Sequence, residues 1–275
     1  MIEKLNGSCS ANAQCANTIK VLSYNLRMDN PDDPHVWAER KAVAFNLIRE
    51  VNPDLIGLQE AQEHMFNDVK EELSDTYFIF GEARSLEEGT EATPVLAKKN
   101  RFNVLYEHSF MLSETPDIKY SKGWDGDLER IASFFILEDK VDMQAFVFFN
   151  THFDHAGVEA RINASLLMSQ IIESYHFQGL ESVLTGDFNA TPDLDDIKGL
   201  LENPELNNSF ASMTNEEQHN SLSFHGFKGK IEGTPIDHIF VSKPWSLKNV
   251  KLERFSENGI YPSDHYPISA EIQKG

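Results

Sequence analysis

Polar residues capable of chemistry recur directly after short apolar runs of this chain. Glu60, Asp264 and the side-chain carbonyl of Asn25 supply oxygen atoms, which are the ligands that a hard cation prefers. The polar residues stand in six segments: Tyr24-Asn25, Leu58-Gln59-Glu60, Asn150-Thr151-His152, Gly186-Asp187-Phe188-Asn189, Ile236-Asp237 and Ser263-Asp264-His265.

The remaining members of the set suit attack on phosphorus. His152 and His265 can bind or protonate phosphate oxygens. Asp187 and Asn189 stand two apart, so on an extended segment both point the same way. One can then polarise a water while the other orients a phosphate oxygen. In-line hydrolysis of a phosphoester needs a metal ion that neutralises charge and a base that takes a proton from water. It also needs hydrogen-bond donors that stabilise the negative charge developing on the phosphate oxygens.

Each segment alone has a simpler structural explanation. Gly186 to Asn189 contains typical turn residues, and Glu60 can begin a helix, where a carboxylate suits the dipole. Asp237 can be an ordinary strand residue with a buried partner, and Ser263 to His265 can be a bend. Only the complete set, in one order along the chain, favours a catalytic centre.

The elements that must position these residues alternate in type. Spacing of apolar residues predicts helices over 36–51, 61–73 and 158–175. Apolar runs predict strands at 19–24, 55–58, 77–80, 102–105, 131–137, 145–150, 182–185, 236–241, 247–255 and 268–272. Two packed sheets with helices outside satisfy this order, so we expect an α/β sandwich. Strand ends gather at one edge of a sheet, where the polar groups can converge.

Composition sets broad limits on partners. The 275 residues carry 44 acidic and 24 basic side chains, a net charge of -20, and no basic stripe that would grip duplex DNA. We expect a polar, flexible leader over 1–17, in which Cys9 and Cys15 are free thiols, and one domain over 18–275. No apolar run is long enough to span a bilayer, and we expect a cytoplasmic monomer.

The ordered set of motifs resembles the endonuclease/exonuclease/phosphatase (deoxyribonuclease I-like) superfamily from Ile19 to about Ile272. The resemblance implies a four-layer α/β sandwich, with two packed mixed β-sheets and helices on the outer faces, and a hydrolase that uses Mg²⁺ or Mn²⁺. It also implies that Glu60 is the principal metal ligand, with Asn25 and Asp264 as its neighbours. The catalytic domain is expected over 18–275.

The same resemblance implies roles for the other motif residues. Asp187 is expected to activate or orient water with Asn189 as its partner, and Asp237 to fix His265. His152 and His265 are expected to contact phosphate. Segments 110–130 and 154–161 resemble a bacterial branch of the superfamily and give three candidates for substrate binding: Arg130, Asp154 and Trp124.

The substrate and three alternatives remain open at this point. The acidic composition favours a small or medium phosphoester, either monoester or diester, over a nucleic acid, but a nuclease acting on DNA or RNA is one alternative. The run from Asn150 to His155 partly matches the zinc motif of metallo-β-lactamase-type hydrolases, a second alternative. A non-catalytic binding module on the same fold is the third.

Overall fold

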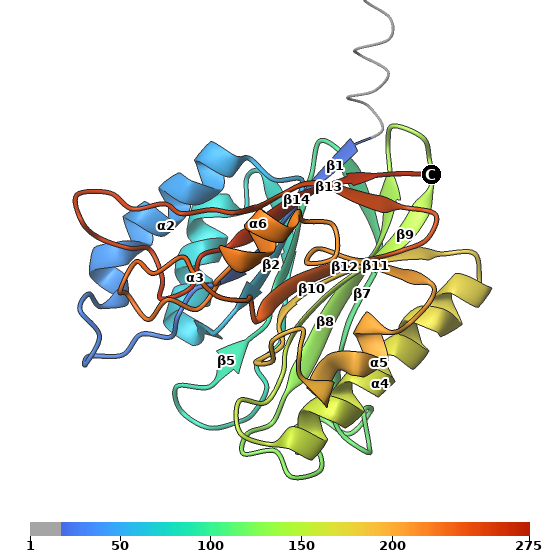
Figure 1. Ribbon diagram of the computed structural model, residues 1–275, viewed down its shortest axis with the longest axis horizontal. Helices are drawn as coiled ribbons and strands as arrows, with labels where there is room; N and C mark the ends of the chain where they lie inside the picture. The colour runs from blue at the N-terminus through green and yellow to red at the C-terminus, as the bar shows by residue number, and fades with distance from the viewer. Residues whose placement is uncertain (1–17) are drawn as a thin grey trace, which may run out of the picture.

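The computed structural model describes residues 18–275, and most of its strands lie in two six-stranded sheets (Figure 1). The first sheet has the order β13 (Ser246–Leu252), β14 (Ile268–Gln273), β1 (Thr18–Asn25), β2 (Leu55–Gln59), β6 (Val95–Lys98), β4 (Tyr77–Phe80). The second has the order β11 (Leu206–Asn208), β12 (Asp237–Ser242), β10 (Glu181–Asp187), β9 (Ala145–His152), β8 (Ile131–Asp139), β7 (Phe102–Met111). The predicted leader and its two cysteines lie outside the described residues.

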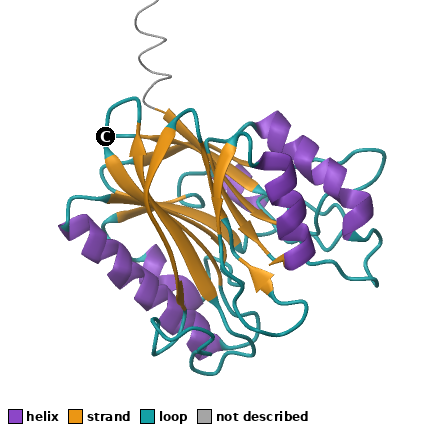
Figure 2. Cartoon of the chain, turned by 180° about the vertical axis from the view of Figure 1, so that it is seen from behind, coloured by secondary structure: helices purple, strands orange, loops and turns teal. Residues whose placement is uncertain are grey.

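Helices cover the outer faces of the two sheets (Figure 2). The long ones are α2 (Trp37–Val51), α3 (Glu63–Leu73) and α4 (Val158–Phe177). The short elements are α5 (Lys198–Leu201), α6 (Asn215–His219), the 3-10 turn η1 (Asp195–Ile197) and the strand pair β3 (Ala61–Gln62) and β5 (Glu91–Ala92). The expected α/β sandwich is therefore confirmed. None of the helices over residues 18–275 is long and apolar enough to cross a membrane.

Alternating side chains of the strands create three separate apolar layers. In β9, Phe146 and Phe148 face the core between the sheets, whereas Val147 and Phe149 pack under α4. On the far side of the first sheet, Leu22 of β1 joins α2 and α3 in a further core. Because both faces of the central strands are covered, these strands read as nearly continuous apolar runs rather than alternating ones.

Both sheets mix parallel and antiparallel pairs, and this determines where polar groups meet. Strand β1 runs parallel to β2, and β9 runs parallel to β10. Strands β12 and β14 are antiparallel to their neighbours β10 and β1. The carboxyl ends of the first four strands and the amino ends of the last two therefore lie at the same edge of the sandwich.

Candidate active site

The site forms where strand ends meet at this edge. Asp187, the last residue of β10, is in register with His152 of parallel β9 and with Asp237 of antiparallel β12. In the other sheet, β1 ends at Asn25 beside the end of β2, which directly precedes Glu60. Strand pairing within each sheet thus brings together residues that lie 35 or 50 positions apart in the chain.

A buried polar layer just behind the edge holds the two sheets at a fixed distance. Asn150 donates from Nδ2 to the Leu58 carbonyl at 2.6 Å, and its Oδ1 accepts from Gln59 Nε2 at 2.7 Å and Thr185 Oγ1 at 3.0 Å. The sheets approach so closely that a Cβ on Gly57 would lie 2.0 Å from Thr185 Oγ1. Asn150 therefore joins the sheets and is not available as a ligand.

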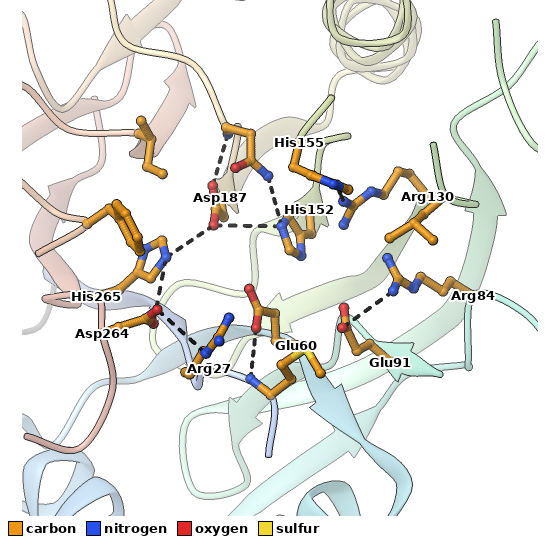
Figure 3. A pocket seen from close by; sticks show the side chains of 15 residues that line it. Arg27, Glu60, Arg84, Glu91, Arg130, His152, His155, Asp187, Asp264 and His265 are labelled. Carbon is orange, nitrogen blue, oxygen red and sulfur yellow. Dashed lines mark hydrogen bonds and ion pairs between the residues drawn. The ribbon is translucent and has the colours of Figure 1, made fainter. Parts of the chain in front are cut away.

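Two carboxylates, those of Glu60 and Asp187, form an acidic cluster at the centre of the site (Figure 3), and Asn25 bonds to both. Asn25 donates from Nδ2 to Glu60 Oε1 at 2.8 Å and to Asp187 Oδ2 at 2.9 Å. The backbone of Glu60 has a φ of 58°, a left-handed conformation that non-glycine residues adopt at a cost and that recurs at functional sites. The side-chain carbonyl of Asn25, which is predicted to bind metal, accepts a hydrogen bond from the Arg27 backbone N–H at 2.8 Å.

The cluster has the chemistry of a divalent-cation site. Ligand atoms of Glu60, His152 and Asp187 all lie within 4.8 Å of one another. Among residues 18–275, Asp264 belongs to no such group, although it lines the same cavity and its Oδ2 lies 3.6 Å from Arg27 Nε. Burial raises the pKa of Asp264. Buried carboxylates that share one cavity are the oxygen ligands that a hard cation stabilises.

His265 and Asp237 form a buried ion pair on one side of the cluster. His265 Nδ1 lies 2.8 Å from Asp237 Oδ2, which leaves Nε2 facing the cavity, 3.7 Å from Asp187 Oδ2. Burial alone would lower the pKa of His265, but the charge and hydrogen bond of Asp237, with Asp187 and Asp264, raise it to about 10. Asp237 therefore favours the protonated form of His265.

His152 is in the opposite state of charge. Burial, followed by the positive charges of Arg130 and Arg84, lowers the pKa of His152 well below its usual value. Its Nε2 lies 3.0 Å from Asn189 Nδ2, which also donates to the Phe153 carbonyl at 3.0 Å. The neutral imidazole thus holds the Asn189 amide in place. The two histidines expected to act as a pair differ in charge.

The pKa of the Asp187 carboxyl group is raised toward neutral pH. Burial and the neighbouring charge of Asp237 raise the pKa of Asp187 to about 7, although His265 and two hydrogen bonds act against this. One of these bonds comes from the Asn189 backbone N–H at 2.9 Å. A carboxylate with a pKa near the working pH is an effective general base.

Two arginines form the wall of the cavity opposite His265 (Figure 3). Arg130 Nε lies 3.3 Å from Asp154 Oδ2, and Arg130 Nη2 lies 3.1 Å from His155 Nδ1. Arg84 Nη2 lies 3.4 Å from Glu91. The cavity therefore has an acidic end for a cation and a guanidinium end for an anion.

Two of the three predicted substrate contacts lie away from the cavity. The Asp154 carboxylate accepts from the backbone of Gly157 at 2.7 Å and of Asp127 and Leu128 at 3.1 Å each, bonds that hold its pKa low against burial. Trp124 is half-buried against the core under α4. Neither Asp154 nor Trp124 is among the described residues that line the cavity. Asp154 contacts Arg130, which does line it, and Trp124 packs against the core under α4.

The cavity has a volume of about 390 Å³ and includes residues that the sequence analysis missed. Arg84, Glu91 and the half-exposed Phe224 belong to no motif, and no spacing signal connects them to the six segments. The full lining is Arg27, Met28, Glu60, Arg84, Glu91, Leu128, Arg130, His152, His155, Asp187, Asn189, Phe224, Ile236, Asp264 and His265.

Comparison with known proteins gives a family match over most of the chain. The model of the Endonuclease/Exonuclease/phosphatase family matches residues 22–265. An uncharacterized protein of Acanthamoeba polyphaga mimivirus is 28% identical over 276 residues, covering 91% of this chain and 98% of the viral protein.

Two solved structures from Bacteroides thetaiotaomicron are similar over almost their whole length. An endonuclease/exonuclease/phosphatase family protein has a TM-score of 0.83 and 29% identity, covering 94% of this chain and 98% of that one. A mannosyl-6-phosphatase has a TM-score of 0.83 and 29% identity, covering 92% of this chain and 99% of that one.

Proposed function

The chain belongs to the endonuclease/exonuclease/phosphatase family, and from this premise we propose that it hydrolyses a small phosphoester with Mg²⁺ or Mn²⁺. One observation carries the proposal. A single cavity is lined by a cluster of carboxylates, by His265, whose protonated form Asp237 favours, and by three arginines. Carboxylates, a proton donor and guanidinium groups are the parts that hydrolysis of a phosphoester requires.

The carboxylate of Glu60 is the group we assign to the cation, with the carboxylate of Asp264 in the same cavity. Asn25 donates from Nδ2 to the carboxylates of Glu60 and Asp187 and so fixes their relative position. When bound, a divalent cation supplies positive charge for the phosphate oxygens. The carboxylates of Glu60 and Asp264 offer oxygen ligands, which favour Mg²⁺ or Mn²⁺ over Zn²⁺, an ion more often held by thiolate and imidazole.

Attack begins with a water next to Asp187. The Asp187 carboxylate takes a proton from that water as the new P–O bond forms. The P–O bond on the opposite side of phosphorus breaks and releases the alcohol, which takes its proton from solvent. Asn189, fixed by His152 and by the Phe153 carbonyl, orients the water against the phosphate. His265 directs its protonated Nε2 at a phosphate oxygen, and Asp237 keeps the proton there. Charge that develops on the phosphate oxygens is thereby stabilised.

Charge and cavity volume support a small substrate. The net charge of -20 repels long polyanions, and a cavity of about 390 Å³ has room for a phosphorylated sugar or a molecule of similar size. The mannosyl-6-phosphatase at 29% identity makes phosphorylated sugars the first class to test. A nuclease is the competing activity, and efficient nicking of plasmid DNA at physiological salt would favour it.

A metal-rescue experiment tests the proposal. Chelated protein is assayed on sugar phosphates and p-nitrophenyl esters after addition of Mg²⁺, Mn²⁺ or Zn²⁺. Mg²⁺ or Mn²⁺ is expected to restore hydrolysis, and Asp187→Asn to reduce it by about 10³-fold, the typical contribution of a general base. Asp75→Asn, on the exposed turn after α3, is the matched control. Restoration by Zn²⁺ alone, or full activity of the Asp187 variant, would contradict the proposal.

A further inference from the structure

We propose that Arg84 and Arg130 bind the second negative charge of a terminal phosphate, and that the enzyme is therefore a phosphomonoesterase. This inference rests on the proposed function and specifies its substrate class. It is carried by the arrangement of charged groups in the wall opposite His265, of which Arg84 and Glu91 belong to no motif.

Arg130 is a fixed donor. Its side chain is 5% exposed, and Asp154 holds Nε at 3.3 Å. The Asp154 carboxylate is itself fixed by backbone N–H groups that include Gly157, at the start of α4. His155 Nδ1 receives the second contact, at 3.1 Å from Nη2. A guanidinium held in this way offers a preorganised planar fork, the geometry that matches two oxygens of a phosphate.

Arg84 is a donor whose hydrogen bonds are incomplete. Its side chain is only 12% exposed, yet the ion pair with Glu91 is long, at 3.4 Å. Its Nη1 is buried and has no hydrogen-bond partner among residues 18–275. A buried, unpaired donor on a charged group is costly to maintain. An oxyanion in the cavity would accept a hydrogen bond from that donor. Binding of a phosphate is therefore favourable for Arg84 in addition to its ion pair with Glu91.

Both guanidiniums face the same space as the acidic cluster. Arg84, Arg130, Glu60 and His152 line one cavity, and Figure 3 shows the arginines together on one side of the central carboxylates. A phosphate in contact with the cation site therefore presents its remaining oxygens to this wall. Glu91 pairs with Arg84 in the free protein, and an incoming phosphate would compete with it.

The number of charges distinguishes two kinds of ester. The phosphate of a diester carries one negative charge, whereas a terminal phosphate carries about -1.5 to -2 at neutral pH. The carboxylates at the acidic end repel the added charge, so a dianion requires cations on its other side. Arg84 and Arg130 supply that positive charge. The phosphate of a diester carries only one negative charge, so the two arginines stabilise it less.

Two esters with the same leaving group test the inference. The rate kcat/KM is measured on p-nitrophenyl phosphate, a dianion, and on methyl p-nitrophenyl phosphate, a monoanion, with the metal-loaded protein. Arg84→Gln is expected to reduce the monoester rate by about 10- to 100-fold, the worth of a charge-assisted hydrogen bond, and the diester rate by less than about threefold. Arg49→Gln, on the outer face of α2, is the matched control and should change neither rate.

A second measurement follows binding without turnover. Calorimetry with inorganic phosphate should show weaker binding to the Arg84→Gln protein, whereas dimethyl phosphate, a monoanion, should bind both proteins alike. Arg84→Lys keeps the charge without the fork and serves where the glutamine variant does not fold. An intermediate, monoester-selective loss in that variant supports the inference, and unchanged discrimination between the esters contradicts it.

The outcomes separate this inference from the proposed function. If the wild-type protein hydrolyses neither ester with Mg²⁺ or Mn²⁺, the proposed function is wrong. If it hydrolyses both and Arg84→Gln reduces the two rates equally, only the inference is overturned. An unchanged rate on p-nitrophenyl phosphate also overturns it, because that substrate has no second anionic group for Arg84 to bind elsewhere.

Discussion

Replacement of Asp237 by Asn should shift the pH dependence of the enzyme to lower pH. The amide retains an oxygen that can accept from His265 Nδ1, so the variant removes the charge while keeping the geometry of the 2.8 Å contact. The Asp237 charge also raises the pKa of Asp187. Both the proposed acid and the proposed base should therefore titrate at lower pH, and the whole bell-shaped profile should move.

The size of the shift follows from the ion pair. Two unit charges about 4 Å apart attract by roughly 4 kcal/mol at an effective dielectric constant of about 20. At about 1.4 kcal/mol per pKa unit, this corresponds to about three units. The pKa of His265 should fall from about 10 to roughly 7. Near pH 8 only about a tenth of the variant would keep the proton, so kcat/KM should fall about tenfold there. Near pH 6 kcat/KM should instead rise, because Asp187 loses its proton at lower pH in the variant.

Two assays check this prediction. NMR titration of the His265 ring in chelated protein gives the pKa directly, and kcat/KM with Mg²⁺ across pH gives its consequence. Glu39→Gln, which removes the carboxylate from the exposed His35–Glu39 pair, is the matched control and should leave both unchanged. A His265 pKa that stays above about 9 in the Asp237 variant would refute the reasoning, because another group would then hold the proton.

Three further predictions follow from the packing around the site. Gly57→Ala should destabilise the fold by about 1–3 kcal/mol in urea titrations, because the new methyl group meets Thr185 Oγ1; an unchanged midpoint would contradict this. Burial lowers the pKa of His238 to about 4, so below about 6.5 the unfolded chain binds a proton that the folded one does not, and stability falls as pH decreases. Between pH 8 and pH 5 the free energy of unfolding of the His238→Asn variant should decrease by about 2 kcal/mol less than that of the wild type. An equal decrease in both proteins would contradict this prediction. Phe224→Ala should raise KM several-fold for substrates with a ring next to the phosphate, since Phe224 is half-exposed at the cavity, 5.1 Å from the His265 ring; equal KM values would exclude this contact.

The elements that hold the motif residues could be predicted because each has a simple sequence pattern. The runs before Asn25, Glu60 and His152 are apolar on both faces, and the structure places them in central strands. The strand Val95–Lys98 was missed. It has four residues and ends in Lys98, which is buried because Asp54 pairs with it at 3.2 Å, a long-range contact that propensity cannot reveal.

The sequence predicted which residues lie together in the site. It did not predict the hydrogen bonds that their side-chain atoms make there. The sequence did not predict that the side-chain carbonyl of Asn25 accepts a hydrogen bond from the Arg27 backbone. It also did not predict that backbone N–H groups near α4 donate to the Asp154 carboxylate. Both differences arise from local hydrogen bonds of loops, whose geometry depends on the finished fold and leaves no periodic pattern in the chain.

The guanidinium wall shows why substrate preference is harder to predict than reaction type. Residues for the reaction lie at strand ends, and register brings them together in any chain with this sheet order, as Asp187 and His152 show. Arg84 lies instead in the loop between β4 and β5, which only a single bridge, from Ala83 to Ala92 of β5, ties to the short strand pair that follows Glu60. Its position depends on Glu91 and on the packing of neighbouring loops. Loops of this kind can vary without disturbing the strand ends, so proteins of this family can share one hydrolytic centre and differ in the charge of the ester they accept.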